Sequence, residues 1–212
     1  VTAVVAVSVA VLVGYGVRLT AIAVTRSAVR VVSVGYAVPG SVIAVGILIP
    51  LGWLDQQINL FARQNFGFLP GLLLTGTMVA LVYAYVVRFL AVSFNTVEAS
   101  LSKVTPNMDA ASRTLGKSAG KTLALVHLPV MRSSLLAAFI LVFVDVMKEL
   151  PATIILRPFN FDTLAVRAFE LASDERLAQA STAALGVVLV GILPVILLSI
   201  AMRKARPGGS GG

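Results

Sequence analysis

Cysteine is absent from this chain of 212 residues, and histidine occurs once, at His127. Without thiols the chain can form neither disulfide bonds nor thiolate metal sites. A single imidazole supplies one metal ligand at most, so we expect His127 to have a structural or interface role. An enzyme embedded in a membrane would need paired histidines or a metal cluster, and the sequence offers neither. We therefore expect no covalent chemistry, no firmly assigned metal site and no bound cofactor.

Charged residues are also scarce. They make up 12% of the chain, 58% of the residues are hydrophobic, and the mean hydropathy is +0.96. These values lie far outside the range of soluble domains. A helix needs roughly 20 apolar residues to cross ~30 Å of hydrocarbon. We therefore expect an all-α, polytopic transmembrane domain with about five spans, at residues 1–17, 31–53, 69–91, 134–155 and 181–202.

The first apolar run is short, with neither an initiator methionine nor a basic segment ahead of it, so it does not fit a signal peptide. We expect the chain to begin inside a larger protein. Residues 1–202 would form the transmembrane domain and residues 203–212 a tail. The glycine-rich end of that tail is typical of a flexible linker or an artificial addition.

Basic residues are distributed unevenly between the two sets of loops. One set carries only Arg63, Arg157, Arg167 and Arg176, accompanied by five acidic residues. The positive-inside rule therefore places the other set, and with it the C-terminus, in the cytoplasm. This bias also accounts for the net charge of +8, so we expect no nucleic-acid partner. The cytoplasmic set contains Arg18, Arg26, Arg30, Lys103, Arg113, Lys117, Lys121, Arg132, Arg203, Lys204 and Arg206.

The most informative segment is the long polar loop at residues 92–133, between the third and fourth spans. We expect two short helices that meet at Gly116, the first capped by Asn107 and the second covering residues 117–127. An acidic residue near the start of the first helix suits the helix dipole. Such a pair of helices on a membrane face would form a docking element for a soluble partner. The residues that define it are Asp109, Ala110, Ala111, Gly116, Leu128 and Pro129.

Two stretches of this loop end like a phosphate-binding loop, at Gly116 and Gly120. That motif needs another glycine five residues earlier, so that backbone N–H groups can wrap the phosphates. The residues at those positions are Ala111 and Leu115. We therefore expect that the chain does not bind ATP itself.

The defining residues of the loop resemble the EAA loop of ABC-importer permeases, in which a coupling helix sits in a cleft of the ATPase subunit. Asp109 stands where the family usually has the longer glutamate. The resemblance implies a MetI-like permease fold, with ATP hydrolysed in the cytoplasm by a separate ABC ATPase. It further implies a periplasmic substrate-binding protein, a second permease half or protomer, and multi-pass insertion in the bilayer of a bacterial inner membrane.

Three further segments, at residues 35–40, 146–151 and 157–165, resemble the C-terminal half of ferric-iron importer permeases. This similarity covers nearly the whole chain from about residue 35, and it implies ferric iron as the transported substrate. Related permeases share much of the same framework, so thiamine, sulfate or molybdate, polyamine and phosphonate remain alternatives. A secondary transporter is a further alternative, but it would leave the long basic loop unexplained.

A second candidate site lies near the outer end of the fourth span. Helical spacing would put Asp145, Lys148 and Glu149 on one face, just before Pro151. Ionisable residues at membrane depth usually face a cavity or a pathway, and carboxylates suit a hard cation. The alternative is a structural pair of Asp145 with Lys148, with Glu149 reaching the interface. Pro151 would free backbone carbonyls, which is tolerated where a helix lines protein or water.

Overall fold

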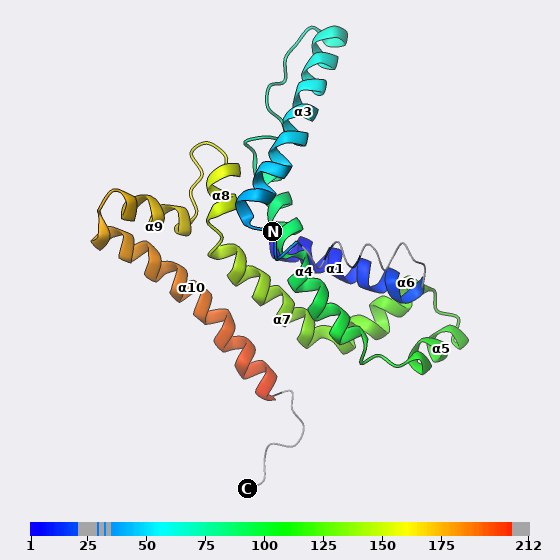
Figure 1. Cartoon of the computed structure of the whole chain (residues 1–212). Coiled ribbons are helices and arrows are strands. Elements are labelled where there is room, and N and C mark those ends of the chain that lie inside the picture. The colour runs from blue at the N-terminus through cyan, green and yellow to red at the C-terminus, as the bar shows by residue number, and fades with distance from the viewer. Residues whose placement is uncertain (21–28, 30–31, 33–34, 205–212) are drawn as a thin grey trace.

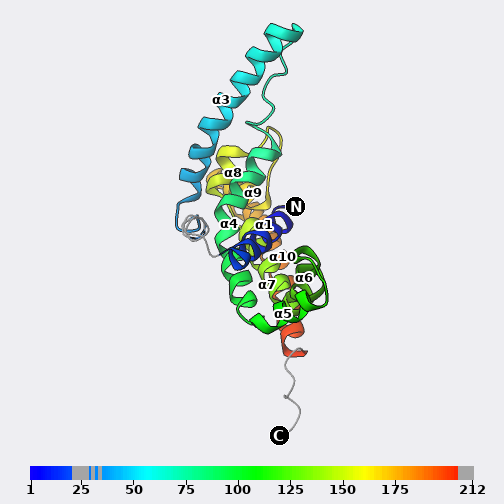
Figure 2. The same ribbon diagram turned by 90° about the vertical axis from the view of Figure 1, so that its right-hand side faces the viewer.

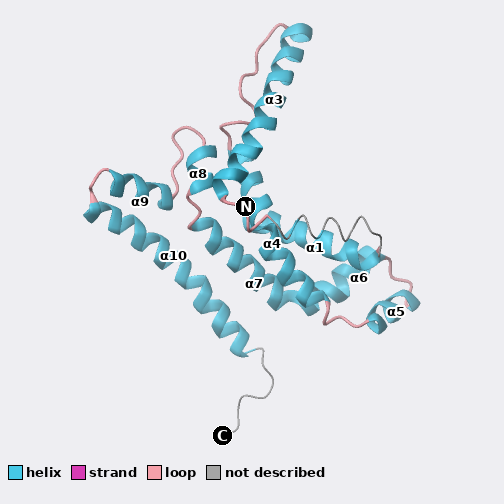
Figure 3. Cartoon of the chain, viewed as in Figure 1, coloured by secondary structure: helices cyan, strands magenta, loops and turns pink. Residues whose placement is uncertain are grey.

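The computed structural model describes residues 1–20, 29, 32 and 35–204, and this part of the chain consists of helices and connecting loops without strands (Figures 1 and 3). The tail from residue 205 and the basic residues Arg26, Arg30 and Arg206 lie outside the described residues. The helices are α1 (Thr2–Leu19), α3 (Gly40–Phe66), α4 (Met78–Leu101), α5 (Pro106–Thr114), α6 (Ala119–Thr122), the π-helical turn η1 (Leu123–His127), α7 (Leu128–Met147), α8 (Pro151–Leu156), α9 (Leu164–Ser173) and α10 (Leu177–Lys204).

Within the described residues, five helical segments are long and apolar enough to cross a membrane. The expected number of spans is therefore confirmed, although several boundaries move. The third span continues to Leu101 instead of residue 91, and the fourth covers Ala119–Met147 instead of residues 134–155. Helix α3 runs thirteen residues past Trp53 to Phe66, and α4 begins only at Met78, whereas an apolar span was expected from residue 69. The sequence between them is apolar but contains Gly67, Gly71 and Gly76, all with positive φ, so it returns along α3 as an extended segment.

Helices α1, α4 and α7 pack side by side and form the centre of the structure, with α10 alongside α7 (Figures 1 and 2). Helix α1 presents small residues to α4, and Ala6 and Ala10 are completely buried. A Cβ atom on Gly14 would lie only 3.1 Å from Leu101 and 3.3 Å from Val97. Small residues allow such close approach, which is the main source of attraction between helices in lipid.

The C-terminal half of α3 extends beyond this bundle, and among the described residues its own return segment, residues 67–77, runs beside it (Figure 1). Asp55 lies inside α3 and is 1% exposed. Its Oδ1 accepts hydrogen bonds from the backbone N–H groups of Leu73 and Leu74, at 3.1 and 2.9 Å. Its Oδ2 accepts from the N–H and the hydroxyl of Thr75, at 2.9 and 2.7 Å. One carboxylate thus satisfies four donors of a segment that has no helix of its own.

We predict that Asp55→Ala will release residues 67–77 from α3. Three backbone donors and one hydroxyl would lose their acceptor, which should cost about 2–3 kcal/mol. Hydrogen exchange followed by mass spectrometry should show faster exchange in peptides that cover residues 67–77. Asp174→Ala removes an exposed carboxylate from a turn and serves as the control. Unchanged exchange in Asp55→Ala would show that the carboxylate does not hold the segment.

Candidate functional site

The short helix α5 carries the first half of the predicted docking element. It begins after Thr105, with Pro106 at the first helical position, where its missing N–H needs no acceptor. Asn107 lies inside the helix, so the expectation that Asn107 caps it is wrong. Gly116 adopts a φ of +71° just past the end of the helix, and its N–H donates to the carbonyl of Arg113 at 2.9 Å. The expected break at Gly116 is therefore confirmed, and the conformation there favours glycine.

The second half of the element does not end at Leu128 and Pro129. Ser118 caps α6, and α6, η1 and α7 then continue as one apolar segment, Ala119–Met147. Leu128 and Pro129 are the first two residues of α7 rather than the close of a loop. Pro129 removes one helical hydrogen bond and crowds the preceding turn. The wider π-helical turn η1 lies directly before it, where such strain is absorbed without a break in the helix.

Asp109 holds α5 against the ends of three other elements. Its Oδ2 accepts hydrogen bonds from Nε and Nη2 of Arg18, at 3.0 and 2.8 Å, and its Oδ1 lies 2.6 Å from Nε2 of His127. Arg18 also donates to the backbone carbonyls of Leu101 and Val104, at 2.8 and 2.7 Å. The cluster therefore joins α1, the end of α4, α5 and η1.

Burial raises the pKa of the Asp109 carboxyl, but the hydrogen bonds from Arg18 and His127 outweigh burial, so this pKa lies below its ordinary value.

His127 is completely buried, and the ring of Tyr15 contacts it edge-on at 5.1 Å between centroids. The Tyr15 hydroxyl donates to the carbonyl of Ala119 at 2.8 Å. These contacts confirm a structural role for His127. They also give Asp109 a role that the sequence did not reveal, because Arg18 is 91 residues away in the chain.

The opposite surface of α5 is exposed to the surroundings of the chain. Ala110 and Ala111 are exposed, and Leu115 at the end of the helix is 76% exposed. Ser112 faces inward and exchanges a 2.8 Å hydrogen bond with Thr122 of α6. The element is thus a short helix fixed on one side and open on the other. It lies at the end of the structure opposite the tip of α3 (Figure 2). A short helix held in this way can bind in a cleft of a partner protein and transmit the partner's movement to the helices that hold it.

The second candidate site differs from the expectation. Helix α7 ends at Met147, so Asp145, Lys148 and Glu149 do not share one helical face. Asp145 pairs with the exposed Lys148 at 2.8 Å, as the structural alternative predicted. Glu149 is instead buried at 6% exposure, so the expectation that it reaches the interface is wrong. Pro151 starts a separate helix, α8, because proline fits the first turn of a helix but not its interior.

Glu149 has two partners that sequence reasoning missed. Its Oε1 accepts a hydrogen bond from the backbone N–H of Ala152 at 3.1 Å, which caps α8. Its Oε2 lies 3.3 Å from Nε of Arg88, in the middle of α4. The signal that could have revealed this pair is a basic residue, Arg88, inside one apolar run and an acidic residue in excess of the cations, Glu149, inside the next.

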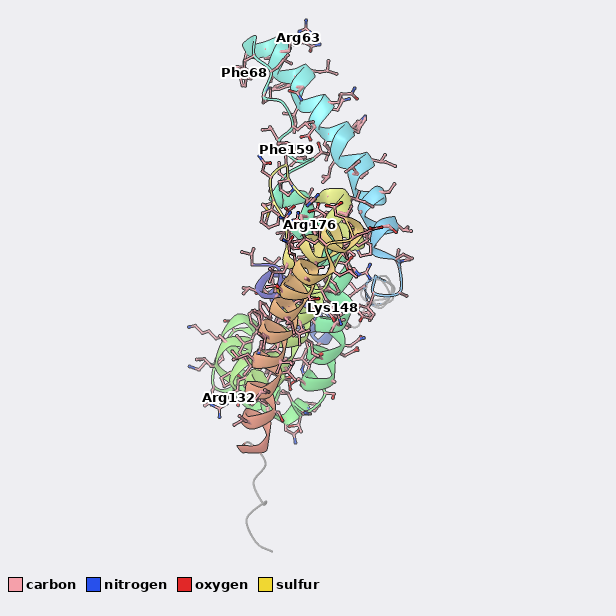
Figure 4. All side chains as sticks on the ribbon, turned by 90° about the vertical axis from the view of Figure 1, so that its left-hand side faces the viewer. Arg63, Phe68, Arg132, Lys148, Phe159 and Arg176 are labelled. Carbon is pink, nitrogen blue, oxygen red and sulfur yellow. The ribbon has the colours of Figure 1, made fainter. Side chains whose placement is uncertain are left out.

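A cavity of about 490 Å³ lies between the start of α1, α4, α7 and residues 161–164. Its wall is largely apolar, with Leu81, Phe139 and Phe143 among the lining residues, and Asp162 is the one charged residue among them. Within the described residues, no three His, Cys, Asp or Glu side chains are grouped as a metal site would require. Lys148 lies between Arg132 at one end of the molecule and Arg63 at the other (Figure 4).

Comparison with known proteins gives the class of this fold. A solved bacterial ABC transporter, involved in the import of the acidic polysaccharide alginate, matches with a TM-score of 0.69. The match covers 97% of this chain and 78% of that one, at 9% sequence identity. The chain is therefore a helical, multi-pass membrane domain with the fold of an ABC-importer permease.

Sequence comparison narrows the resemblance, although no family model matches. The chain is 33% identical over 122 residues to the Fe(3+)-transport system permease protein FbpB 2 of Haemophilus influenzae, a match that covers 58% of this chain and 24% of that protein. It is 26% identical over 172 residues to a Salmonella typhimurium protein named as a 2-aminoethylphosphonate transport system permease, PhnV, covering 81% of this chain and 58% of that protein. The resemblance to ABC-importer permeases, with ferric permeases among them, is thus confirmed. The chain spans about a quarter of the length of the ferric permeases it matches.

We predict that Asp109→Asn will loosen α5 and lower the free energy of unfolding by about 1–3 kcal/mol, because Arg18 loses its anionic partner. A carboxyl whose pKa is lowered by folding stabilises the protein above its unfolded pKa, and this contribution is lost as the pH falls through the folded pKa. The difference between wild type and variant should therefore shrink on acidification below the ordinary carboxyl pKa of about 3.9.

Thermal unfolding in detergent, followed at neutral and acidic pH, would measure both effects. Glu98→Gln, which neutralises an exposed carboxylate on α4, is the matched control and should change little. Equal stability of Asp109→Asn and Glu98→Gln would contradict the role assigned to the cluster.

Proposed function

We propose that this chain is part of the transmembrane subunit of an ABC importer and does no covalent chemistry itself. The observation that carries the proposal is the geometry of α5, a short helix fixed by Asp109 on one side and exposed at Ala110, Ala111 and Leu115 on the other. The exposed side would seat in a cleft of a separate ATPase subunit. ATP would be bound and hydrolysed there and not by this chain.

The path of the coupled movement follows from the connections of the element. Ser112 of α5 is hydrogen-bonded to Thr122 of α6, and α6 continues through η1 into α7. A helical segment of 29 residues is about 44 Å long and moves nearly as a rigid body. Closure of the ATPase would therefore tilt or shift α7, whose far end borders the cavity and the pair of Glu149 with Arg88.

The same proposal assigns an orientation and further partners. The positive-inside rule places α5 and the C-terminus in the cytoplasm of a bacterial cell, with the spans in the inner membrane. A periplasmic binding protein would deliver substrate to the opposite end, where residues 157–176 and the tip of α3 lie. A second permease half or protomer would complete the route between the spans, and it would cover helix faces that are exposed in this chain.

We propose ferric iron as the transported substrate, supported by the similarity to ferric permeases. The chain is also similar to a protein named as a 2-aminoethylphosphonate permease, so phosphonate is the second candidate substrate. Iron would be cargo here and not a resident metal. Thiamine, sulfate or molybdate, and polyamine are less favoured as substrates, because the relatives described above are named for ferric iron or 2-aminoethylphosphonate transport. A secondary transporter would give α5 no partner.

We predict that Leu115→Asp will uncouple the transporter without unfolding it. Leu115 is 76% exposed, so a charge there costs the fold little, but it would be driven into an apolar contact on docking. The ATPase subunit should co-purify less, and substrate-stimulated ATP hydrolysis should fall roughly tenfold or more, which corresponds to 1.4 kcal/mol. Leu72→Asp, at a site of 68% exposure on the return segment of α3, is the matched control. Normal coupling in Leu115→Asp would exclude α5 as the docking element.

We predict that uptake of radioactive ferric iron by cells will depend on this gene. Deletion should abolish iron uptake, and the intact gene but not the Leu115→Asp variant should restore it. Uptake of 2-aminoethylphosphonate, thiamine, sulfate and a polyamine, measured in the same strains, serves as the control. Loss of phosphonate uptake with normal iron uptake would favour the second candidate and exclude the first.

A further inference from the structure

The segment at residues 148–150 is an elbow between two helices. Helix α7 ends at Met147, and α8 begins at Pro151, whose ring cannot continue the preceding helix. Two side-chain contacts bind α8 and the elbow to α4. The Thr153 hydroxyl donates to the carbonyl of Glu149 at 2.6 Å and accepts at 2.5 Å from the hydroxyl of Tyr85. The second contact is the pair of Glu149 with Arg88.

The pair of Glu149 with Arg88 is buried but incompletely bonded. The side chain of Glu149 is 6% exposed and that of Arg88 is 19% exposed. Nε of Arg88 is 3.3 Å from the carboxylate, yet it forms no hydrogen bond of acceptable geometry within the described residues. Nη1 of Arg88 reaches the carbonyl of Val38 at the long distance of 3.4 Å. Charge attraction therefore holds the pair together without the hydrogen bonds that would make it tight.

A buried ion pair of this kind is a poor device for stability alone. The cost of removing two charges from water often exceeds their attraction, and apolar residues of similar size stabilise a fold equally well. The pair is therefore better explained by a function in which it forms and separates. Its position suits that function, because it joins the middle of α4 to the far end of the segment that begins at α6.

The start of α3 closes the third side of this junction. Gly40, the first residue of α3, is buried against the pair. A Cβ atom added there would lie 2.4 Å from Nη1 of Arg88 and 2.4 Å from Oε1 of Glu149. Both atoms are the ends of long, flexible side chains, so a methyl group at this position would push the ion pair apart while the helices keep their places.

We propose that Arg88 and Glu149 form a latch that holds the elbow against α4 in the resting transporter and separates when the ATPase moves α7. This inference rests on the proposed function. It assigns to Arg88, Glu149 and Gly40 a regulatory role in that cycle: the closed latch keeps ATP hydrolysis low until substrate is delivered. Asp145 pairs with the exposed Lys148 instead, and neither residue takes part in the latch.

The test uses the intact transporter, with its ATPase subunit, in proteoliposomes. Gly40→Ala should part the latch and raise ATP hydrolysis in the absence of substrate by roughly fivefold or more, the lower range of coupling between two sites. Gly46→Ala is the matched control, because a Cβ atom there meets nothing within 4 Å on the same helix. Equal basal hydrolysis in Gly40→Ala, Gly46→Ala and wild type would overturn the latch.

A second variant covers the case in which Gly40→Ala assembles poorly. Arg88→Met combined with Glu149→Gln removes both charges but retains an acceptor for the N–H of Ala152. It should assemble normally and show the same raised hydrolysis without substrate. Normal basal hydrolysis in this assembled double variant would refute the latch while leaving the proposed function standing. Failure of Leu115→Asp to affect hydrolysis would instead refute the proposed function itself.

Discussion

The absence of water in the hydrocarbon core of a membrane is the constraint on which this structure depends. Every backbone N–H and carbonyl group at that depth needs a partner inside the protein, which favours uninterrupted helices. Here each main interruption is covered by one charged side chain. Asp55 binds the N–H groups of the segment returning from α3, and Glu149 caps α8. Arg18 binds the carbonyls at the end of α4.

Two of these residues also pair with a charged residue on a distant part of the chain. Arg18 meets Asp109 of α5, and Glu149 meets Arg88 of α4. A charge that satisfies a helix end is thus shared with a second element. Truncation of Arg18 or Glu149 would expose backbone groups and free an opposite charge together. The few charged residues of this apolar chain therefore determine how its helices are joined.

Much of the fold could be predicted from composition and spacing. Apolar runs of sufficient length gave five spans, and the glycine after a short polar helix gave the break at Gly116. The boundaries could not be predicted equally well, because hydropathy does not distinguish an apolar helix from an apolar extended segment such as residues 67–77. The elbow could not be predicted for a related reason. The apolar run at residues 134–155 continues past Pro151, so it was expected to form a single span. Only the position of α8 against α4 reveals that the helix ends at Met147.

The candidate site was predictable in its residues but not in its geometry. Asp109, Ala110, Ala111 and Gly116 lie together as the motif implied. The pairing of Asp109 with Arg18 depends on the packing of α1 against α4, which local sequence does not encode. Its pairing with His127 depends on the turn of η1. Both contacts bridge segments that are distant in the sequence, so reasoning from neighbouring residues could not supply them.

The π-helical turn η1 also sets the rotational phase between α5 and the elbow. A π turn contains one more residue than the α-helical turn it replaces. Since each α-helical residue turns the chain by about 100°, the same residues Leu123–His127 wound as a regular α-helix would rotate α6 by about that angle relative to α7. The exposed face of α5 would then point in another direction while every span remained intact. The π-helical winding of this one turn therefore controls the direction from which a partner can approach the domain.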